Sequence, residues 1–252
     1  MKHRSDPEIL NQLTLERDHR RLAELLSPGL RVLDAGCGTG SITAGIAKRV
    51  GATGQVVGID RDGFLLEQAR TAHADLANLE FEQAELRDYQ PAQGFDIATA
   101  ARVLQWISPP QPALDRLCAA VEPGGWVVVL DYNHAAHTWD PPARPEFRKF
   151  YEAFLSWRDA NGWSNHIADE LPALMREAGL VEIESRDETE TDPQRVAGIW
   201  THMIDSLGPT LVAAGFLTET ERLAARRANE AWRTGEGRAL QFVLKAVTGR
   251  VP

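Results

Sequence analysis

Residues 31–41 have the sequence RVLDAGCGTGS, and the rest of the chain is organised around them. The stretch begins as an apolar, β-branched run, turns through Gly36, Gly38 and Gly40, and enters a segment with apolar residues at helical spacing. Backbone N–H groups and the helix dipole converge at such a turn, which suits a polar or anionic ligand group. Glycine allows close approach of the backbone to a ligand and positive φ without strain. The stretch therefore predicts a strand, a ligand-binding turn and a helix.

The composition of the 252 residues is that of an ordinary globular protein, with 43% hydrophobic and 25% charged residues. Apolar runs such as 126–130 are far too short to span a membrane, and the charged N-terminus is not followed by an apolar signal core. Cys37 and Cys118 are the only cysteines, and neither stands in a metal-ligand spacing. We therefore expect a cytoplasmic protein with no metal site and no membrane partner.

The charge balance bears on the class of partner. The formal net charge is −9, and no basic run is longer than Arg226-Arg227. Binding to a phosphate backbone requires a clustered basic face, so we expect no nucleic-acid partner.

Short apolar strands alternate with helices over the first 131 residues, a pattern that predicts parallel βαβ units with helices on both faces of a sheet. Residues 7–27 are predicted to be helical. A last strand is expected at 240–247, antiparallel because it can return by a helical excursion. The six preceding strands are predicted at 30–35, 55–60, 79–83, 95–100, 126–131 and 181–186.

Two classes of glycine turn must be compared with this one. The dinucleotide fingerprint requires a third glycine at the sixth position, where this chain has Ser41. The Walker A pattern fails because no Gly-Lys-Ser/Thr follows. Asp34, two places before the first glycine, is poorly placed for a pyrophosphate and well placed for an amine or a backbone donor.

The acidic-x-Gly-x-Gly-x-Gly turn resembles motif I of the class I S-adenosylmethionine-dependent methyltransferases. The resemblance continues through VGID at 57–60, QAEL at 83–86, FDIA at 95–98 and EPGG at 122–125. These landmarks stand in the order of that family over residues 31–131. The resemblance implies a Rossmann-like, doubly wound α/β sheet of seven strands with the last antiparallel, and a helical cap inserted after strand five.

The same resemblance divides the chain, which is expected to be one methyltransferase domain over 1–252. We expect an N-terminal helical cap at 1–29 and an S-adenosylmethionine-binding core at 30–131. An aromatic cap insertion follows at 132–166, and the C-terminal part of the sheet with its helices occupies 167–252.

The resemblance also implies a cofactor site for S-adenosylmethionine, with S-adenosylhomocysteine as the product. Asp60 lies 24 residues after Gly36, close to the spacing between a turn and a ribose-binding carboxylate. Asp34 is expected near the methionyl ammonium, and Glu85 with the Leu86 N–H near the adenine amine. The expected cofactor-binding residues are Asp34, Gly36, Cys37, Gly38, Gly40, Asp60, Arg61, Glu85, Leu86, Ala101 and Arg102.

The segment after the fifth strand supplies candidates for the acceptor side. It leaves the sheet at its carboxyl edge, where open α/β sheets bind ligands. His134 is the candidate catalytic base, and the alternative is that it only caps the insertion. Aromatic side chains can wall an acceptor or form the core of the cap. The expected substrate-contacting residues are Trp106, Tyr132, Asn133, His137, Trp139, Tyr151 and Trp157.

The predicted function is methyl transfer from S-adenosylmethionine to an O, N or C atom of a small organic acceptor, by a monomer or a homodimer. The sequence 99–102 after strand four lacks the Asn/Asp-Pro-Pro-aromatic motif of nucleic-acid amino-methyltransferases. One alternative is an S-adenosylmethionine-binding protein without methyl transfer, either cyclase-like or a sensor. A nicotinamide oxidoreductase is disfavoured by Ser41.

Overall fold

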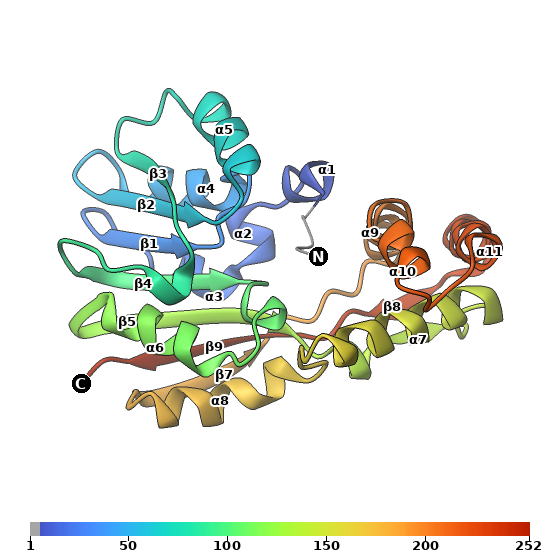
Figure 1. The fold of residues 1–252 in the computed structure, drawn as a ribbon. Helices are drawn as coiled ribbons and strands as arrows, with labels where there is room; N and C mark the ends of the chain where they lie inside the picture. Colours follow the sequence, from blue (N-terminus) through green and yellow to red (C-terminus); the bar gives the residue numbers. More distant parts are fainter. Residues whose placement is uncertain (1–5) are drawn as a thin grey trace.

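A seven-stranded sheet forms the centre of the computed structural model, which describes residues 6–252. The strand order is β3-β2-β1-β4-β5-β9-β7, and β9 alone runs against the other strands of this sheet (Figure 1). The predicted α/β fold with an antiparallel last strand is therefore confirmed. The strands are β1 Arg31–Ala35, β2 Gln55–Asp60, β3 Leu79–Gln83, β4 Phe95–Ala101, β5 Val121–Tyr132, β7 Val181–Asp187 and β9 Leu244–Arg250.

Helices cover both faces of this sheet because side chains alternate along each strand. On β1, Val32 packs in a core with helices α3 and α4, while Leu33 packs in the opposite core with α6 and α8. Among residues 6–252, no helix is both long enough and apolar enough to cross a membrane. The covering helices are α3 Arg20–Leu25, α4 Ser41–Val50, α5 Gly63–Ala72, α6 Gln111–Ala119 and α8 Ile167–Glu177.

A helical cap lies beyond the carboxyl end of β5 (Figure 1). Its core is aromatic and includes Phe147, Phe150, Phe154 and Trp200. The cap is larger than the predicted insertion 132–166, because helices of the C-terminal part pack into the same core. The cap elements are β6 Thr138–Asp140, α7 Pro145–Ala160, α9 Pro193–Ser206, α10 Gly208–Ala213, α11 Glu219–Ala231, the short helix η4 Trp232–Glu236 and β8 Ala239–Gln241.

The predicted last strand at 240–247 is divided in the structure. Residues 239–241 form β8, which pairs with β6 in a separate two-stranded sheet, and β9 begins at Leu244. The Val243 carbonyl accepts a hydrogen bond from the Asn133 N–H, so the backbone changes partners between the two strands. This break joins the cap to the main sheet.

The predicted N-terminal helix is three short helices: α1 Pro7–Leu10, α2 Leu15–Asp18 and α3. The Thr14 side chain caps α2, and the Asp18 carboxylate accepts the Thr14 N–H at 2.7 Å. His19 then adopts a non-helical φ of −152°. Local side-chain hydrogen bonds therefore outcompete a continuous helix. Residues 1–5 of the predicted segment 1–29 lie outside the described residues.

The carboxylate of Glu188, directly after β7, binds the N-terminus of α3. The buried Glu188 accepts hydrogen bonds from the backbone N–H groups of Arg20 and Arg21, at 3.1 and 2.6 Å. His19, the N-cap residue, supplies no such side-chain bond. Glu188 therefore satisfies the free N–H groups at the start of α3 and complements its dipole.

We expect Glu188→Ala to lower the free energy of unfolding by about 2 kcal/mol, because it removes a charged acceptor from two backbone amides at the start of α3. Glu184→Ala is the matched control: its carboxylate, also from the β7 region, makes only exposed ion pairs, and its loss should lower stability much less. Chemical denaturation measures both. Equal losses would contradict the role of Glu188.

Candidate functional site

The glycine turn between β1 and α4 is tied to the end of β2. The N–H groups of Gly36 and Cys37 both donate to the Ile59 carbonyl, at 2.7 and 3.0 Å. Gly36, Gly38 and Gly40 all have positive φ, at 78°, 55° and 77°. A Cβ on Gly36 would lie 2.3 Å from Val103 Cγ2. The turn therefore requires glycine both for its backbone angles and for its packing.

Two carboxylates flank this turn. Asp34 is buried and accepts a hydrogen bond from the Thr43 hydroxyl at 2.7 Å. Asp60, at the end of β2, accepts the N–H groups of Gly38 and Asp62 at 2.9 and 2.8 Å. Burial raises the pKa of Asp34 to about 6 against the opposing effect of the Thr43 hydrogen bond. Burial also raises the pKa of Asp60.

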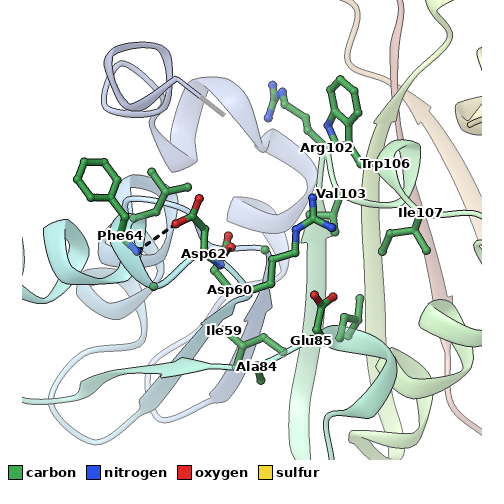
Figure 2. A pocket seen from close by; sticks show the side chains of 15 residues that line it. Ile59, Asp60, Asp62, Phe64, Ala84, Glu85, Arg102, Val103, Trp106 and Ile107 are labelled. Atoms are coloured by element: carbon green, nitrogen blue, oxygen red, sulfur yellow. Dashed lines mark hydrogen bonds between the residues drawn. The ribbon is translucent and has the colours of Figure 1, made fainter. Parts of the chain in front are cut away.

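A cavity of about 560 Å³, here called the larger cavity, opens beside the turn. In Figure 2, Asp60 and Asp62 come from the end of β2, Glu85 from the segment after β3, and Arg102 and Trp106 from the segment after β4. The predicted cofactor-binding residues that line the larger cavity are Gly36, Asp60, Arg61, Glu85, Leu86 and Arg102.

A second cavity, here called the inner chamber, has a volume of about 170 Å³ and reaches from the turn into the cap. Gly36, Asp60 and Arg102 line both spaces, so the two meet at the turn. Leu10 of α1 closes one side, lying where a Cβ on Gly38 would be 2.8 Å from Leu10 Cδ1. The aromatic side chains that line the chamber are Trp106, Tyr132, Phe154, Trp200 and Phe242.

The other predicted cofactor residues are distributed differently. Asp34, Cys37, Gly38 and Ala101 line the inner chamber. Gly40 lines neither space, because Phe81 and His73 lie against it. Burial raises the pKa of the Cys37 thiol well above its usual range, so the thiol stays protonated.

The predicted acceptor residues also separate into two groups. Trp106, Tyr132 and His134 line the inner chamber, and the other five do not. Asn133 donates to Asp169 at 2.6 Å, and Trp157 packs on Trp106 and Trp163. Trp139 and Tyr151 line a separate cavity of about 170 Å³. The last of the five, His137, has its Nδ1 2.6 Å from the Tyr151 hydroxyl.

The tautomer of His134 follows from its neighbours. Its Nε2 lies 2.6 Å from Gln105 Oε1, an oxygen that also accepts Arg158 Nη1 at 3.4 Å. Nε2 therefore carries the proton, and Nδ1 is an acceptor without a partner among residues 6–252. Burial, with the positive charge of Arg158, lowers the pKa of His134 well below 6.5. The ring is thus neutral, suited to accept a hydrogen bond and poor at retaining a proton.

Four charged side chains form a paired cluster beside the chamber. Glu190 accepts Arg102 Nη2 at 3.2 Å and also pairs with Arg195 Nη1. Arg195 Nη2 in turn contacts the buried Asp18 at 2.5 Å. Arg102 also donates to the Tyr132 hydroxyl at 2.8 Å and has a φ of 63°, rare for a residue with a side chain. The side chains of these pairs are at most 16% exposed, so the pairs are screened less by solvent than surface ion pairs are.

The chamber residues that were not predicted from the sequence include a group from the C-terminal part of the chain: Glu190, Arg195, Trp200 and Phe242. They come from segments far beyond strand five along the chain, and no recognisable motif marks them. The one available signal was Trp200 on the apolar face of a helix, and that pattern is equally typical of core packing.

We expect Gly36→Ala to destabilise the fold by more than Gly179→Ala. Both glycines have positive φ, which costs about 1–2 kcal/mol for alanine, but nothing lies within 4 Å of a Cβ on Gly179. The Val103 clash should add about 1–3 kcal/mol at Gly36. Denaturation of both variants measures this difference, and adding Val103→Ala to Gly36→Ala should recover part of it. Equal effects at the two positions would refute the packing constraint.

We expect Asp34→Asn to stabilise the protein in a pH-dependent way. Between pH 3.8 and about 6 the unfolded chain loses the Asp34 proton while the folded chain retains it, so the wild type loses stability as pH rises through that window. Above pH 6 the variant should be more stable by about 2–3 kcal/mol. Denaturation series across pH test this, with the exposed Asp75→Asn as control. A difference that does not vary with pH would contradict the burial effect.

Three comparisons with known proteins bear on this site. The sequence profile of the family described as "Methyltransferase domain" matches residues 26–190. The chain is 31% identical over 140 residues to the trans-aconitate 2-methyltransferase of Deinococcus radiodurans, covering 54% of this chain and 52% of that protein. The chain spans about half the length, or less, of the curated relatives it matches.

Two solved structures share the fold. One is phosphoethanolamine N-methyltransferase 2 of Haemonchus contortus in complex with phosphomonomethylethanolamine and S-adenosylhomocysteine, with a TM-score of 0.59, 16% identity, and coverage of 92% of this chain and 52% of that chain. The other is the cyclase SpnF, with a TM-score of 0.56, 18% identity, and coverage of 99% and 86%. The fold alone therefore does not distinguish methyl transfer from cyclisation.

The family profile covers more than half of the chain and includes the glycine turn, both flanking carboxylates and the strands that carry them. The resemblance predicted from the sequence is confirmed, and with it a family whose cofactor is S-adenosylmethionine. The chain belongs to the methyltransferase-domain family.

Proposed function

We propose that this chain transfers a methyl group from S-adenosylmethionine to a small organic acceptor. The observation that carries the proposal is the meeting of the larger cavity and the inner chamber at the glycine turn. A cofactor and an acceptor in these two spaces would be in contact at that junction. The bound cofactor supplies a methyl group on a positively charged sulfur, and the protein contributes position and exclusion of water.

The residues of the larger cavity fit this cofactor. Each carboxylate oxygen of Asp60 accepts one backbone N–H and keeps a lone pair for a ribose hydroxyl. Glu85 and Leu86 line the part of the cavity that would receive the adenine, and the Leu86 N–H is the backbone donor that the adenine would meet there. Asp34 lines the inner chamber beside the turn where the two spaces meet, so it would bind the methionyl ammonium at that junction, and a positive charge there would favour the ionised carboxyl that burial opposes.

The inner chamber fits an acceptor. Its aromatic walls limit the access of water and offer ring faces that attract a sulfonium. His134 would orient the acceptor by accepting a hydrogen bond at Nδ1. Because the pKa of His134 is low, the ring would hold a proton only weakly. A proton lost by the acceptor would therefore be released to solvent.

The alternatives are less well supported. A relative more than 30% identical is a methyltransferase, which favours methyl transfer over cyclase-like chemistry or a sensor role. A chamber of about 170 Å³ walled in part by the cap favours a small molecule over nucleic acid as the acceptor. The cytoplasmic location and the monomeric or homodimeric state remain predictions from the sequence.

Calorimetry should show that S-adenosylmethionine binds more tightly than NAD. Asp60→Asn should weaken S-adenosylmethionine by about tenfold or more, because a hydrogen bond to a charged group contributes about 1.5–3 kcal/mol. The exposed Asp75→Asn, with the same change of charge, should leave binding unchanged. Turnover is then measured as release of S-adenosylhomocysteine with a panel of small acceptors. NAD binding without S-adenosylmethionine binding would refute the proposal, and cofactor binding without turnover would favour the cyclase-like or sensor alternative.

A further inference from the structure

Two arginine side chains form part of the wall of the inner chamber. Arg102 and Arg195 both line it, and their side chains are 12% and 16% exposed, so both keep accessible surface. The guanidinium of Arg102 lies on the chamber side, because its partners Tyr132 and Glu190 line the inner chamber and not the larger cavity. A ligand in the chamber can therefore meet two guanidinium groups.

Both guanidinium groups keep hydrogen-bond donors for a ligand. Arg102 donates three hydrogen bonds within residues 6–252, to the Tyr132 hydroxyl, the Asp18 carbonyl and Glu190. Arg195 donates two, to Glu190 and to the Asp18 carboxylate. A guanidinium has five N–H groups in a planar fork, so donors remain on both arginines in a geometry that suits a carboxylate.

The carboxylates beside these two arginines are shared. The two oxygens of Glu190 accept Arg102 and Arg195, while Asp18 pairs with Arg195 and with the half-exposed Arg17. A ligand that drew one guanidinium toward itself would therefore leave Glu190 and Asp18 each with at least one arginine. A cationic ligand at Glu190 would instead have to compete with two arginines that already occupy its oxygens.

A third arginine lies behind the same wall. Arg158 is fully buried, and its Cζ lies 4.8 and 5.5 Å from the ring centroids of Trp106 and Phe154, both of which line the chamber. Among residues 6–252 it forms no ion pair, and its hydrogen bonds all go to amide and carbonyl oxygens. The wall thus contains a buried positive charge without a carboxylate in contact.

Two carboxylates influence Arg158 only through an intervening amide. Asp131 accepts the N–H of Gln105, whose carbonyl accepts Arg158. Asp159, which is exposed, accepts the side-chain N–H of Asn165, whose Oδ1 accepts Arg158. Burial raises the pKa of Asp131 to about 7 and lowers that of Arg158 to about 10, so the positive charge is not fully compensated. A negative charge in the chamber would stabilise it.

The other carboxylates that line the chamber lie away from these arginines. Asp34 and Asp60 flank the glycine turn, where the ammonium and the ribose of the cofactor are proposed to bind. Asp6, at the start of α1, faces His202 of α9 at 4.0 Å. The chamber therefore has a negative side at the turn and a positive side at its arginines.

We propose that the methyl acceptor is an anion whose carboxylate binds Arg195 and Arg102 in the inner chamber, with its apolar part against the aromatic walls. The two guanidinium groups hold the carboxylate by their remaining N–H groups, and Arg158 strengthens its binding from behind the wall. The three arginines thereby select anionic acceptors over neutral and cationic ones. This inference rests on the proposed function, because it assigns the inner chamber to the methyl acceptor.

Three probes that share a phenyl ring test the charge requirement. Phenylacetate, phenylacetamide and 2-phenylethylamine differ in carrying an anionic, a neutral or a cationic group. Calorimetric titration of the protein saturated with S-adenosylhomocysteine should show phenylacetate binding about tenfold or more tightly than either of the others, because hydrogen bonds to charged groups are the stronger ones. Equal affinities, preference for the neutral or the cationic probe, or no binding of phenylacetate would overturn the inference.

The direct contact is tested by Arg195→Gln, which removes the positive charge. This variant should weaken phenylacetate by about tenfold and phenylacetamide by less than about twofold. Arg195→Lys keeps the charge without the planar fork, so it should retain the preference for phenylacetate at reduced affinity. Arg226→Gln, at an exposed arginine of α11, is the matched control and should leave both affinities unchanged. Equal weakening of the two probes by Arg195→Gln would indicate a structural defect and overturn the assigned contact.

The cofactor also carries a carboxylate, and its binding is measured separately. Arg195 lines the inner chamber and not the larger cavity, so Arg195→Gln should bind S-adenosylhomocysteine as the wild type does. Weakened S-adenosylhomocysteine binding with unchanged phenylacetate binding would assign the arginine to the methionyl carboxylate and overturn the inference. Failure of S-adenosylmethionine to bind the wild type would instead remove the proposed function. Turnover confined to neutral or amine acceptors would leave methyl transfer intact and overturn only the acceptor class.

Discussion

The approach of Val103 to Gly36 at the end of β1 is the contact on which the site depends. It brings the segment after β4 against the glycine turn, while the turn's own N–H groups are held by the Ile59 carbonyl of β2. The ends of three neighbouring strands are thereby fixed relative to one another. Asp34 and Asp60 are consequently held on either side of one turn, and burial makes both carboxyls harder to ionise by raising the pKa of each. A positively charged ligand would offset the free-energy cost of ionising these buried carboxyls. Binding of such a ligand would therefore also stabilise the fold.

The inner chamber depends on a different kind of constraint, because its walls come from distant parts of the chain. Asp18 belongs to the N-terminal helices and Arg102 to the segment after β4. Glu190 precedes helix α9, and Arg195 lies in its first turn. Their mutual pairing joins these segments and balances the charges of the cluster. The aromatic side chains of the cap then supply the walls of the chamber. Position and exclusion of water are what methyl transfer needs most from a protein.

The sheet and the turn could be predicted from residues 31–131 because periodicity and glycine spacing are local properties of the sequence. The extent of the cap could not, since helix α9 and the aromatic insertion share one core only through tertiary packing. The same limit explains why Trp139 and Tyr151 line a separate cavity while Trp200 lines the chamber. An aromatic residue at helical spacing predicts burial but not which neighbour it is buried against. The division of the N-terminal helix at His19 likewise depends on side-chain hydrogen bonds within and beyond that segment.

The central claim is that a cofactor in the larger cavity meets an acceptor in the inner chamber at the glycine turn. A crystal structure of the complex with S-adenosylhomocysteine tests it most directly. The account predicts the ribose at Asp60, the adenine beside Glu85 and Leu86, and the sulfur directed toward the chamber bounded by His134 and Trp200. A ligand bound with its sulfur directed away from that chamber, or outside the larger cavity, would contradict the account.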